Sequence, residues 1–157
     1  MSIITKSPSE TELIGKKLAN KLNSGDILLL SGDLGAGKTS LVKGIARGLG
    51  IENEITSPTF TLMNIYKINN SAAFQRTLRG VISPNQKIKN FVHIDTYRLK
   101  NEKELMEIGV ADYLGQPNTI CAIEWPEKIT SLLKKKKTIS ISLEHTQNPQ
   151  QRKVYIS

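Results

Sequence analysis

The chain has 157 residues, an apolar share of 38% and a formal net charge of +8, which fits one globular domain with a single core. Apolar runs such as Ile27–Leu30 are far shorter than the roughly 18 residues of a membrane span, and the N-terminal segment lacks the continuous apolar stretch of a secretory signal. We therefore expect one cytoplasmic domain over residues 1–157, with no membrane contact and an anionic partner such as a nucleotide, a nucleic acid or an acidic protein.

The first part of the chain predicts a helix, a strand and a second helix, in that order. Residues 7–22 carry apolar side chains at helical spacing behind serine–glutamate capping pairs, which predicts an amphipathic helix. The segment 26–30 ends in consecutive apolar residues, the pattern of a parallel strand that is covered on both faces. A second helix begins at Lys38 and is ended by Gly48 and Gly50.

The remainder of the chain predicts further strands, one more helix and an insertion. Strands are expected at 59–68, 91–99 and 119–125, a helix at 101–109, and two alternating segments at 138–145 and 152–157 that suit edge strands or a hairpin. Residues 69–90 are polar and contain glycine and proline, which indicates an exposed insertion. Strands that alternate with helices predict an α/β fold: a mostly parallel sheet flanked by helices, with antiparallel edge strands.

One segment carries a specific chemical signal. Residues Gly32–Thr39 match G-x-x-x-x-G-K-[ST] directly after the first buried strand and directly before a helix. Glycines bring backbone N–H groups within reach of anionic oxygens, and the following helix points its positive end at the same place. Lys38 supplies a charge for the β- and γ-phosphates, and the Thr39 hydroxyl can bind magnesium. The pattern predicts a P-loop that binds a nucleoside triphosphate.

Hydrolysis requires an acidic group near the metal or the attacking water, and two carboxylates are suitably located. Asp95 and Glu124 each follow an apolar strand, so both lie at the same sheet edge as the P-loop if these strands run parallel. Their roles are not separable from sequence, and both could be ordinary surface carboxylates. Thr59 lies in a segment that can sense the γ-phosphate, although Pro58 gives a structural explanation for the same segment.

Several other residues near these segments favour structural roles. Trp125 adjoins Glu124 and either covers the nucleotide or packs against a strand end, with packing favoured. His93 is better explained as a satisfied core or rim histidine than as a catalytic group, and Cys121 as a buried strand thiol. The basic segment 133–138 lacks interleaved aromatic residues, which favours a solvated turn before a strand.

Taken together, four blocks of sequence resemble the TsaE family of bacterial P-loop ATPases, also called YjeE. The blocks are "GDLGAGKTSLVKGIARGLG", "ITSPTFTL", "HIDTYRL" with "KELMEIGV", and "CAIEWPEK". The resemblance implies a single α/β P-loop NTPase domain that binds ATP with Mg²⁺ and hydrolyses it slowly.

The resemblance also implies roles for individual residues. It puts Gly35, Ala36, Gly37, Lys38, Thr39 and Ser40 around the phosphates, with Thr39 and Glu124 on magnesium, Thr59 in a switch-like position, and Lys38, Asp95 and Glu124 as catalytic residues. It assigns Thr11 and Arg152 only loosely to contacts at the edge of the nucleotide.

In that family the ATPase acts with TsaB and TsaD, which transfer a threonylcarbamoyl group to adenosine 37 of tRNAs that read ANN codons. The resemblance implies that ATP turnover resets the transferase and that tRNA is contacted indirectly through the complex. The 69–90 segment departs from the shorter link usual in the family. Two alternatives stay open: a small-molecule kinase, with Arg76 and Arg79 in a lid, and a nucleotide switch that binds RNA through its basic C-terminal region.

Overall fold

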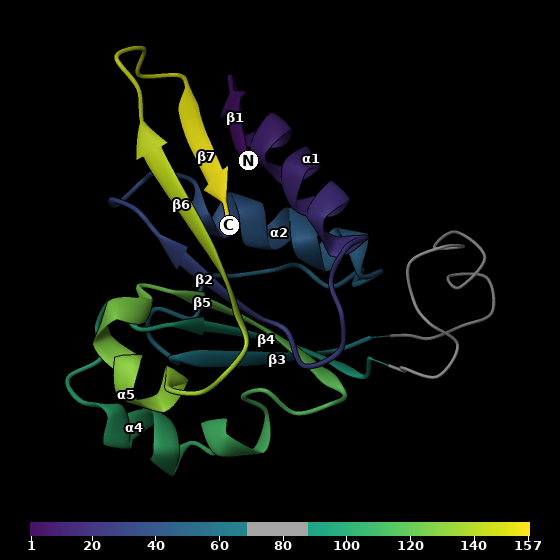
Figure 1. Ribbon diagram of the computed structural model, residues 1–157, viewed down its shortest axis with the longest axis vertical. Helices are drawn as coiled ribbons and strands as arrows, with labels where there is room; N and C mark the ends of the chain where they lie inside the picture. The colour runs from purple at the N-terminus through teal and green to yellow at the C-terminus, as the bar shows by residue number, and fades with distance from the viewer. Residues whose placement is uncertain (69–87) are drawn as a thin grey trace.

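The computed structural model describes residues 1–68 and 88–157. Its described helices and strands alternate along most of the chain (Figure 1). In chain order they are β1 (Ser2–Thr5), α1 (Pro8–Ala19), β2 (Ile27–Ser31), α2 (Lys38–Gly48), β3 (Met63–Lys67), β4 (Asn90–Asp95), α4 (Glu102–Glu107), β5 (Thr119–Glu124), α5 (Thr130–Leu133), β6 (Thr138–His145) and β7 (Arg152–Ile156).

The strands form one sheet in the order β1-β7-β6-β2-β5-β4-β3. Strands β6, β2, β5 and β4 are parallel, whereas β3 pairs antiparallel with β4, and β7 pairs antiparallel with both β6 and β1. The predicted fold class, a mostly parallel sheet with antiparallel edge strands, is confirmed. The hairpin predicted at the C-terminus is β6–β7, but neither strand lies at an edge, because β1, which the sequence analysis missed, covers β7.

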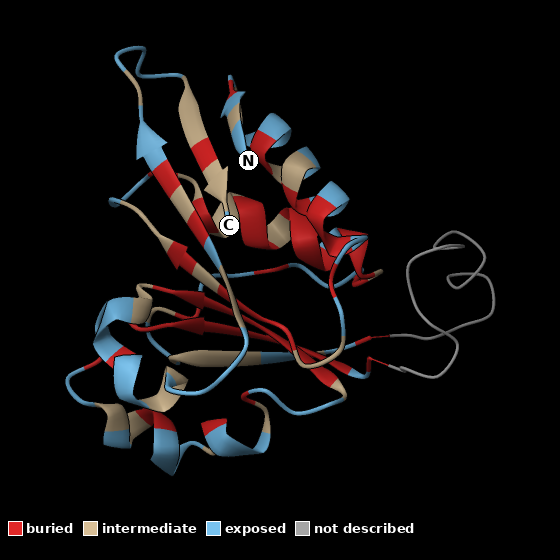
Figure 2. Cartoon of the chain, in the orientation of Figure 1, coloured by how far each residue is buried: buried red, intermediate tan, exposed pale blue. Residues whose placement is uncertain are grey.

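Helices cover both faces of the sheet, with α1 and α2 on one side and α4 and α5 on the other (Figure 1). Each face has its own apolar cluster: one joins β-strand residues such as Leu28 and Ile141 to α1 and α2, and the other joins Ile27 and Ile123 to the α4–α5 side. Figure 2 shows the central strands buried and the outer faces of the helices exposed. The alternation along β2 therefore divides one strand between two cores.

Helices α1 and α2 pack at backbone distance. A Cβ added to Gly44 would lie 2.0 Å from the carbonyl oxygen of Glu12, so a side chain there would force the helices apart. This close packing fixes α2, and with it the loop that precedes α2, against the body of the domain.

The predicted 69–90 insertion lies mostly outside the described residues. Of its last three positions, Ile88 and Asn90 are buried, and Asn90 is the first residue of β4. Among the described residues, no helix combines the length and apolar character that a membrane crossing requires.

Candidate functional site

The P-loop connects the carboxyl end of β2 to the first turn of α2. Its backbone enters the left-handed region at Gly35 (φ 75°) and at Gly37 (φ 98°), a conformation that favours glycine. Gly37 caps α2, and the helix has no side-chain cap. The first-turn N–H groups of Lys38, Thr39 and Ser40 therefore have no acceptor within the helix and remain available to an anion.

The Lys38 side chain folds back along the P-loop. Its Nζ donates to the carbonyl oxygens of Gly32 at 2.6 Å and Asp33 at 2.9 Å, and it lies 3.8 Å from the centre of the Trp125 ring. Only 5% of Lys38 is exposed. Burial lowers the pKa of its ammonium group, while the negative charges of Glu124 and Asp95 oppose that shift. The charge is thus held beside the loop that precedes α2.

The two carboxylates that the sequence singled out lie side by side at this sheet edge. Asp95 and Glu124 are aligned in the parallel β4–β5 pair, at the last residue of each strand, and each is only 3% exposed. Oε1 of Glu124 accepts a hydrogen bond from the Thr39 hydroxyl at 2.9 Å. Parallel pairing therefore brings both acids to the start of α2.

Asp95 contacts a different partner. Its Oδ2 accepts hydrogen bonds from Thr59 Oγ1 at 2.6 Å and from Ser57 Oγ at 3.0 Å, and its Oδ1 accepts from the backbone N–H of Tyr97 at 2.9 Å. The geometry separates two acids that sequence could not: Glu124 is bonded to the P-loop helix, and Asp95 to the 57–59 segment.

These groups converge on a cavity of about 610 Å³. Most of the predicted site residues reach it; the lining residues are Leu34, Gly35, Gly37, Lys38, Thr39, Ser40, Ser57, Thr59, Asp95, Tyr97, Arg98, Glu124 and Trp125. Ala36, which was predicted to contact the phosphates, is fully buried and is absent from this lining.

Five lining residues were not assigned to a site from sequence: Leu34, Ser57, Tyr97, Arg98 and Trp125. Packing, the favoured explanation for Trp125, accounts for its ring contact with Tyr97 at 5.0 Å, but the Trp125 ring also borders the cavity beneath Lys38. Its backbone is left-handed, with φ 61°, a conformation that non-glycine residues adopt rarely and that clusters at functional sites. The sequence signal that could have identified these unassigned residues is their position: Tyr97 and Arg98 come two and three residues after Asp95, and Trp125 directly follows Glu124.

The donor set fits Mg²⁺. Mg²⁺ prefers oxygen ligands, and the Thr39 hydroxyl and the Glu124 carboxylate, whose Oε1 lies 2.9 Å from Thr39 Oγ1, bring two such groups together beside the P-loop. No group of three or more His, Cys, Asp or Glu side chains within residues 1–68 and 88–157 could hold a metal ion. Mg²⁺ usually takes one or two protein carboxylates together with phosphate oxygens and water.

A smaller cavity of about 330 Å³ borders the other side of the P-loop. Thr11 and Arg152 line it together with Gly35, Gly37 and Ser40. Arg152 also donates from Nη2 to the carbonyl oxygen of Gly35 at 3.3 Å. The two residues that the family resemblance assigned loosely to the nucleotide edge are thus brought beside the P-loop.

A buried strand, a glycine loop and an uncapped helix, set in a mostly parallel sheet, define an α/β protein of the P-loop class. The family model described as "Threonylcarbamoyl adenosine biosynthesis protein TsaE" matches residues 5–154. The chain therefore belongs to the TsaE family.

Individual relatives agree with this family. A tRNA threonylcarbamoyladenosine biosynthesis protein TsaE from Synechocystis is 42% identical over 125 residues, covering 78% of this chain and 68% of its own. The protein of the same name from Treponema pallidum is 35% identical over 143 residues, covering 91% and 90%. The crystal structure of Bacillus subtilis YdiB superimposes with a TM-score of 0.70 at 28% identity, over 98% of this chain and 82% of that one.

Proposed function

We propose that this protein binds ATP with Mg²⁺ and hydrolyses it slowly, as a component required for the threonylcarbamoylation of adenosine 37 in tRNAs that read ANN codons. It acts on the TsaB–TsaD complex and contacts tRNA indirectly, in the cytoplasm. Membership of the TsaE family supports the pathway. The nucleotide chemistry is supported by one observation above the others: the 2.9 Å contact between Thr39 and Glu124 at the uncapped start of α2.

Each residue has a proposed role that its contacts support. Backbone N–H groups of Gly35 and of residues 37–40 hold the phosphates, whereas the N–H of Ala36 donates to the carbonyl oxygen of Asp33 at 3.1 Å. Lys38 leaves its carbonyl partners to neutralise the β- and γ-phosphate oxygens. Thr39 and Glu124 hold magnesium, which stabilises negative charge on the transferring phosphoryl group. Asp95 holds Thr59 in position to sense the γ-phosphate. The smaller cavity beside Thr11 and Arg152 takes the nucleoside end of ATP.

ATP turnover drives a conformational cycle of the partner rather than the phosphorylation of a small molecule. The proposed magnesium ligands Thr39 and Glu124 line the same cavity as Thr59, which supports a change in the position of the 57–59 segment when ATP and Mg²⁺ bind. The surface that faces TsaB and TsaD then has one conformation when ATP is bound and another after the products are released.

The decisive experiment measures ATP hydrolysis by the full chain, alone and with the cognate TsaB–TsaD complex. We expect slow hydrolysis alone and stimulation, or complete dependence, in the presence of the complex, together with ATP-dependent modification of tRNA. Equal hydrolysis in both conditions and modification that proceeds without this protein would contradict the proposal.

The basic segment gives the RNA-binding alternative little support. Lys137 forms an ion pair with buried Asp26 at 3.1 Å, and Lys136 donates to the carbonyl oxygen of Leu114 at 3.1 Å. The segment also precedes β6, at the opposite end of the parallel strands from the P-loop. Weak retention of tRNA in a filter-binding assay without TsaB and TsaD is expected, whereas tight retention would favour direct binding. For the kinase alternative, Arg76 and Arg79 lie outside the described residues.

A further inference from the structure

His93 is a fully buried polar side chain between apolar neighbours on β4. Its Nε2 lies 2.9 Å from Oε1 of Glu124. Its Nδ1 is the single buried side-chain nitrogen or oxygen without a hydrogen-bond partner in the described part of the chain. A buried imidazole costs free energy that an apolar side chain at this position would avoid. The contact with Glu124 is what offsets that cost and accounts for histidine here.

Strand register explains how the two side chains meet. In the parallel β4–β5 pair, His93 is aligned with Ala122, and Glu124 is the next residue of β5 on the same face. The methyl group of Ala122 is small enough for the imidazole to extend past it toward Glu124. The contact is therefore built into the sheet rather than into a loop.

The ring nitrogen that faces Glu124 carries a hydrogen. A carboxylate can only accept hydrogen bonds, so Nε2 must donate. With a hydrogen on Nε2 alone, Nδ1 is an unpaired acceptor, which is less costly in a protein interior than an unpaired N–H group. The Nε2–H group of His93 and the hydroxyl of Thr39 then both donate to Oε1 of Glu124.

We propose that His93 is a positioning residue that orients the Glu124 carboxylate for magnesium through this buried hydrogen bond. The inference rests on the proposed function of Glu124 as a metal ligand. With Oε1 held by His93 beside Thr39, Oε2 accepts no hydrogen bond from the described residues, and Glu124 lines the cavity. The buried ring thus fixes the carboxylate plane and the direction in which its lone pairs point, as partners of metal ligands commonly do.

Two amide substitutions test the donor itself. In His93→Gln the side-chain NH₂ group reaches the position of Nε2, whereas in His93→Asn the shorter side chain ends near Nδ1. We would measure the increase in Tm that Mg²⁺ adds to the ADP-bound protein, and the Mg²⁺ concentration that gives half of it. We expect His93→Asn to need about 10- to 100-fold more Mg²⁺, and His93→Gln to resemble the wild type. ADP affinity without Mg²⁺ should be unchanged in both variants.

The outcomes separate this inference from the proposed function. If the wild type gains no stability from Mg²⁺ with ADP, the proposed metal site itself fails. If the wild type responds and His93→Asn responds equally, or if both variants lose ADP affinity without Mg²⁺, the positioning role is overturned. Should His93→Asn not fold, His93→Gln decides: a wild-type Mg²⁺ response supports the role, and a tenfold weaker response in a folded His93→Gln protein refutes it.

A double-mutant comparison adds a second control. In a Glu124→Ala background, His93 has no carboxylate to orient, so His93→Asn should change the Mg²⁺ response no further. A further loss in that background would mean that His93 acts through another group.

Discussion

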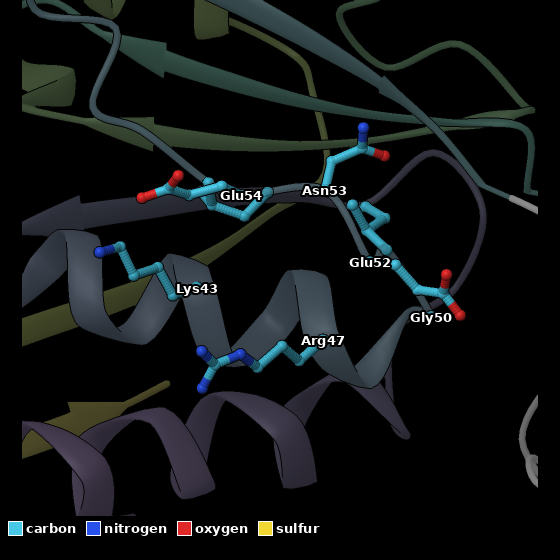
Figure 3. A pocket seen from close by; sticks show the side chains of 8 residues that line it. Lys43, Arg47, Gly50, Glu52, Asn53 and Glu54 are labelled. Atoms are coloured by element: carbon cyan, nitrogen blue, oxygen red, sulfur yellow. The ribbon is translucent and has the colours of Figure 1, made fainter.

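Two cavities of similar volume border α2, and they differ in what lines them. The P-loop cavity measures about 610 Å³ and the other, beside the C-terminal half of α2, about 680 Å³. Figure 3 shows the second cavity, with Lys43 and Arg47 on the helix and Glu52, Asn53 and Glu54 on the segment that follows it. Both cavities therefore contain cations and carboxylates, and volume does not distinguish them.

Burial and mutual contact do distinguish them. In the P-loop cavity, Lys38, Asp95 and Glu124 are all at most 5% exposed, and each bonds to a backbone or side-chain group from another segment. In the second cavity, Glu52 and Glu54 are exposed, and the Arg47 side chain, which pairs with Glu12, is 65% exposed. Burying a charge costs free energy, so several buried charges at one sheet edge indicate a functional role. Solvated charges carry no such cost and do not indicate one.

The largest expected effect is that of Lys38→Ala, which is compared with removal of a lysine from the second cavity. Lys38→Ala should reduce ATP hydrolysis by about 100- to 1,000-fold, because it removes a preorganised charge from the phosphate site. The matched control, Lys43→Ala, lies on the same helix and should leave hydrolysis close to wild type. Steady-state phosphate release checks both, with Tm as a test of folding. Comparable losses in the two variants would mean that the cavities are not functionally distinct.

The next comparison removes one carboxylate from each cavity. Glu124→Ala should lower magnesium-dependent turnover by about 100-fold or more, because a metal ion contributes several kcal/mol of transition-state stabilisation. ADP binding measured without magnesium should change little. Glu54→Ala is the control and should match the wild type in both assays. If Glu124→Ala weakened ADP binding and turnover equally, its proposed role at the metal would be wrong.

A smaller effect is expected in the segment that Asp95 holds. Thr59→Val removes a hydrogen bond to a charged group, worth about 1.5–3 kcal/mol, so residues 57–61 should exchange their amide hydrogens about tenfold faster or more. Thr61→Val is the control, because Thr61 bonds only to Asn64 at the exposed surface, at 3.1 Å. Unaltered exchange in Thr59→Val would show that Asp95 does not hold this segment.

The smallest effect concerns a titratable group that is buried away from both cavities. Burial raises the pKa of the Cys121 thiol to about 12, and because the neutral form is favoured, only about one part in ten thousand is thiolate at pH 8. We expect a thiol reagent to label Cys121 far more slowly in the native protein than in the urea-unfolded chain. ATP hydrolysis by native protein treated with the reagent should be unchanged. Rapid native labelling would indicate that the β5 core opens.

Local sequence patterns determined much of the fold. The capping pair at Ser7 and Glu10 predicted α1, and the observed helix has Ser7 as its cap. Asn101 likewise caps α4. Continuous apolar runs predicted the buried strands β2 and β5, because a strand covered on both faces has no polar side. The P-loop was evident because each of its conformational and chemical requirements falls within eight consecutive residues.

Sequence patterns failed where the outcome depended on strand neighbours. The alternating segments of β6 and β7 suited edge strands or a hairpin; they form the hairpin, but β6 lies between β2 and β7, and β7 between β6 and β1. The short β1 was missed because β7, its partner in the described sheet, is at the other end of the chain. Local propensity contains no information on which distant strand pairs with which.

The residues of the candidate site were largely identifiable from sequence, whereas their partners were not. Sequence alone indicated a P-loop, two acids at strand ends and a threonine, Thr59, in a segment predicted to sense the γ-phosphate. Only the tertiary structure decided that Glu124 faces Thr39 and His93 while Asp95 faces Thr59. The reason is physical: parallel pairing of β4 with β5 and of β5 with β2 sets the register that brings these side chains within hydrogen-bonding distance, and that register is a property of the assembled sheet.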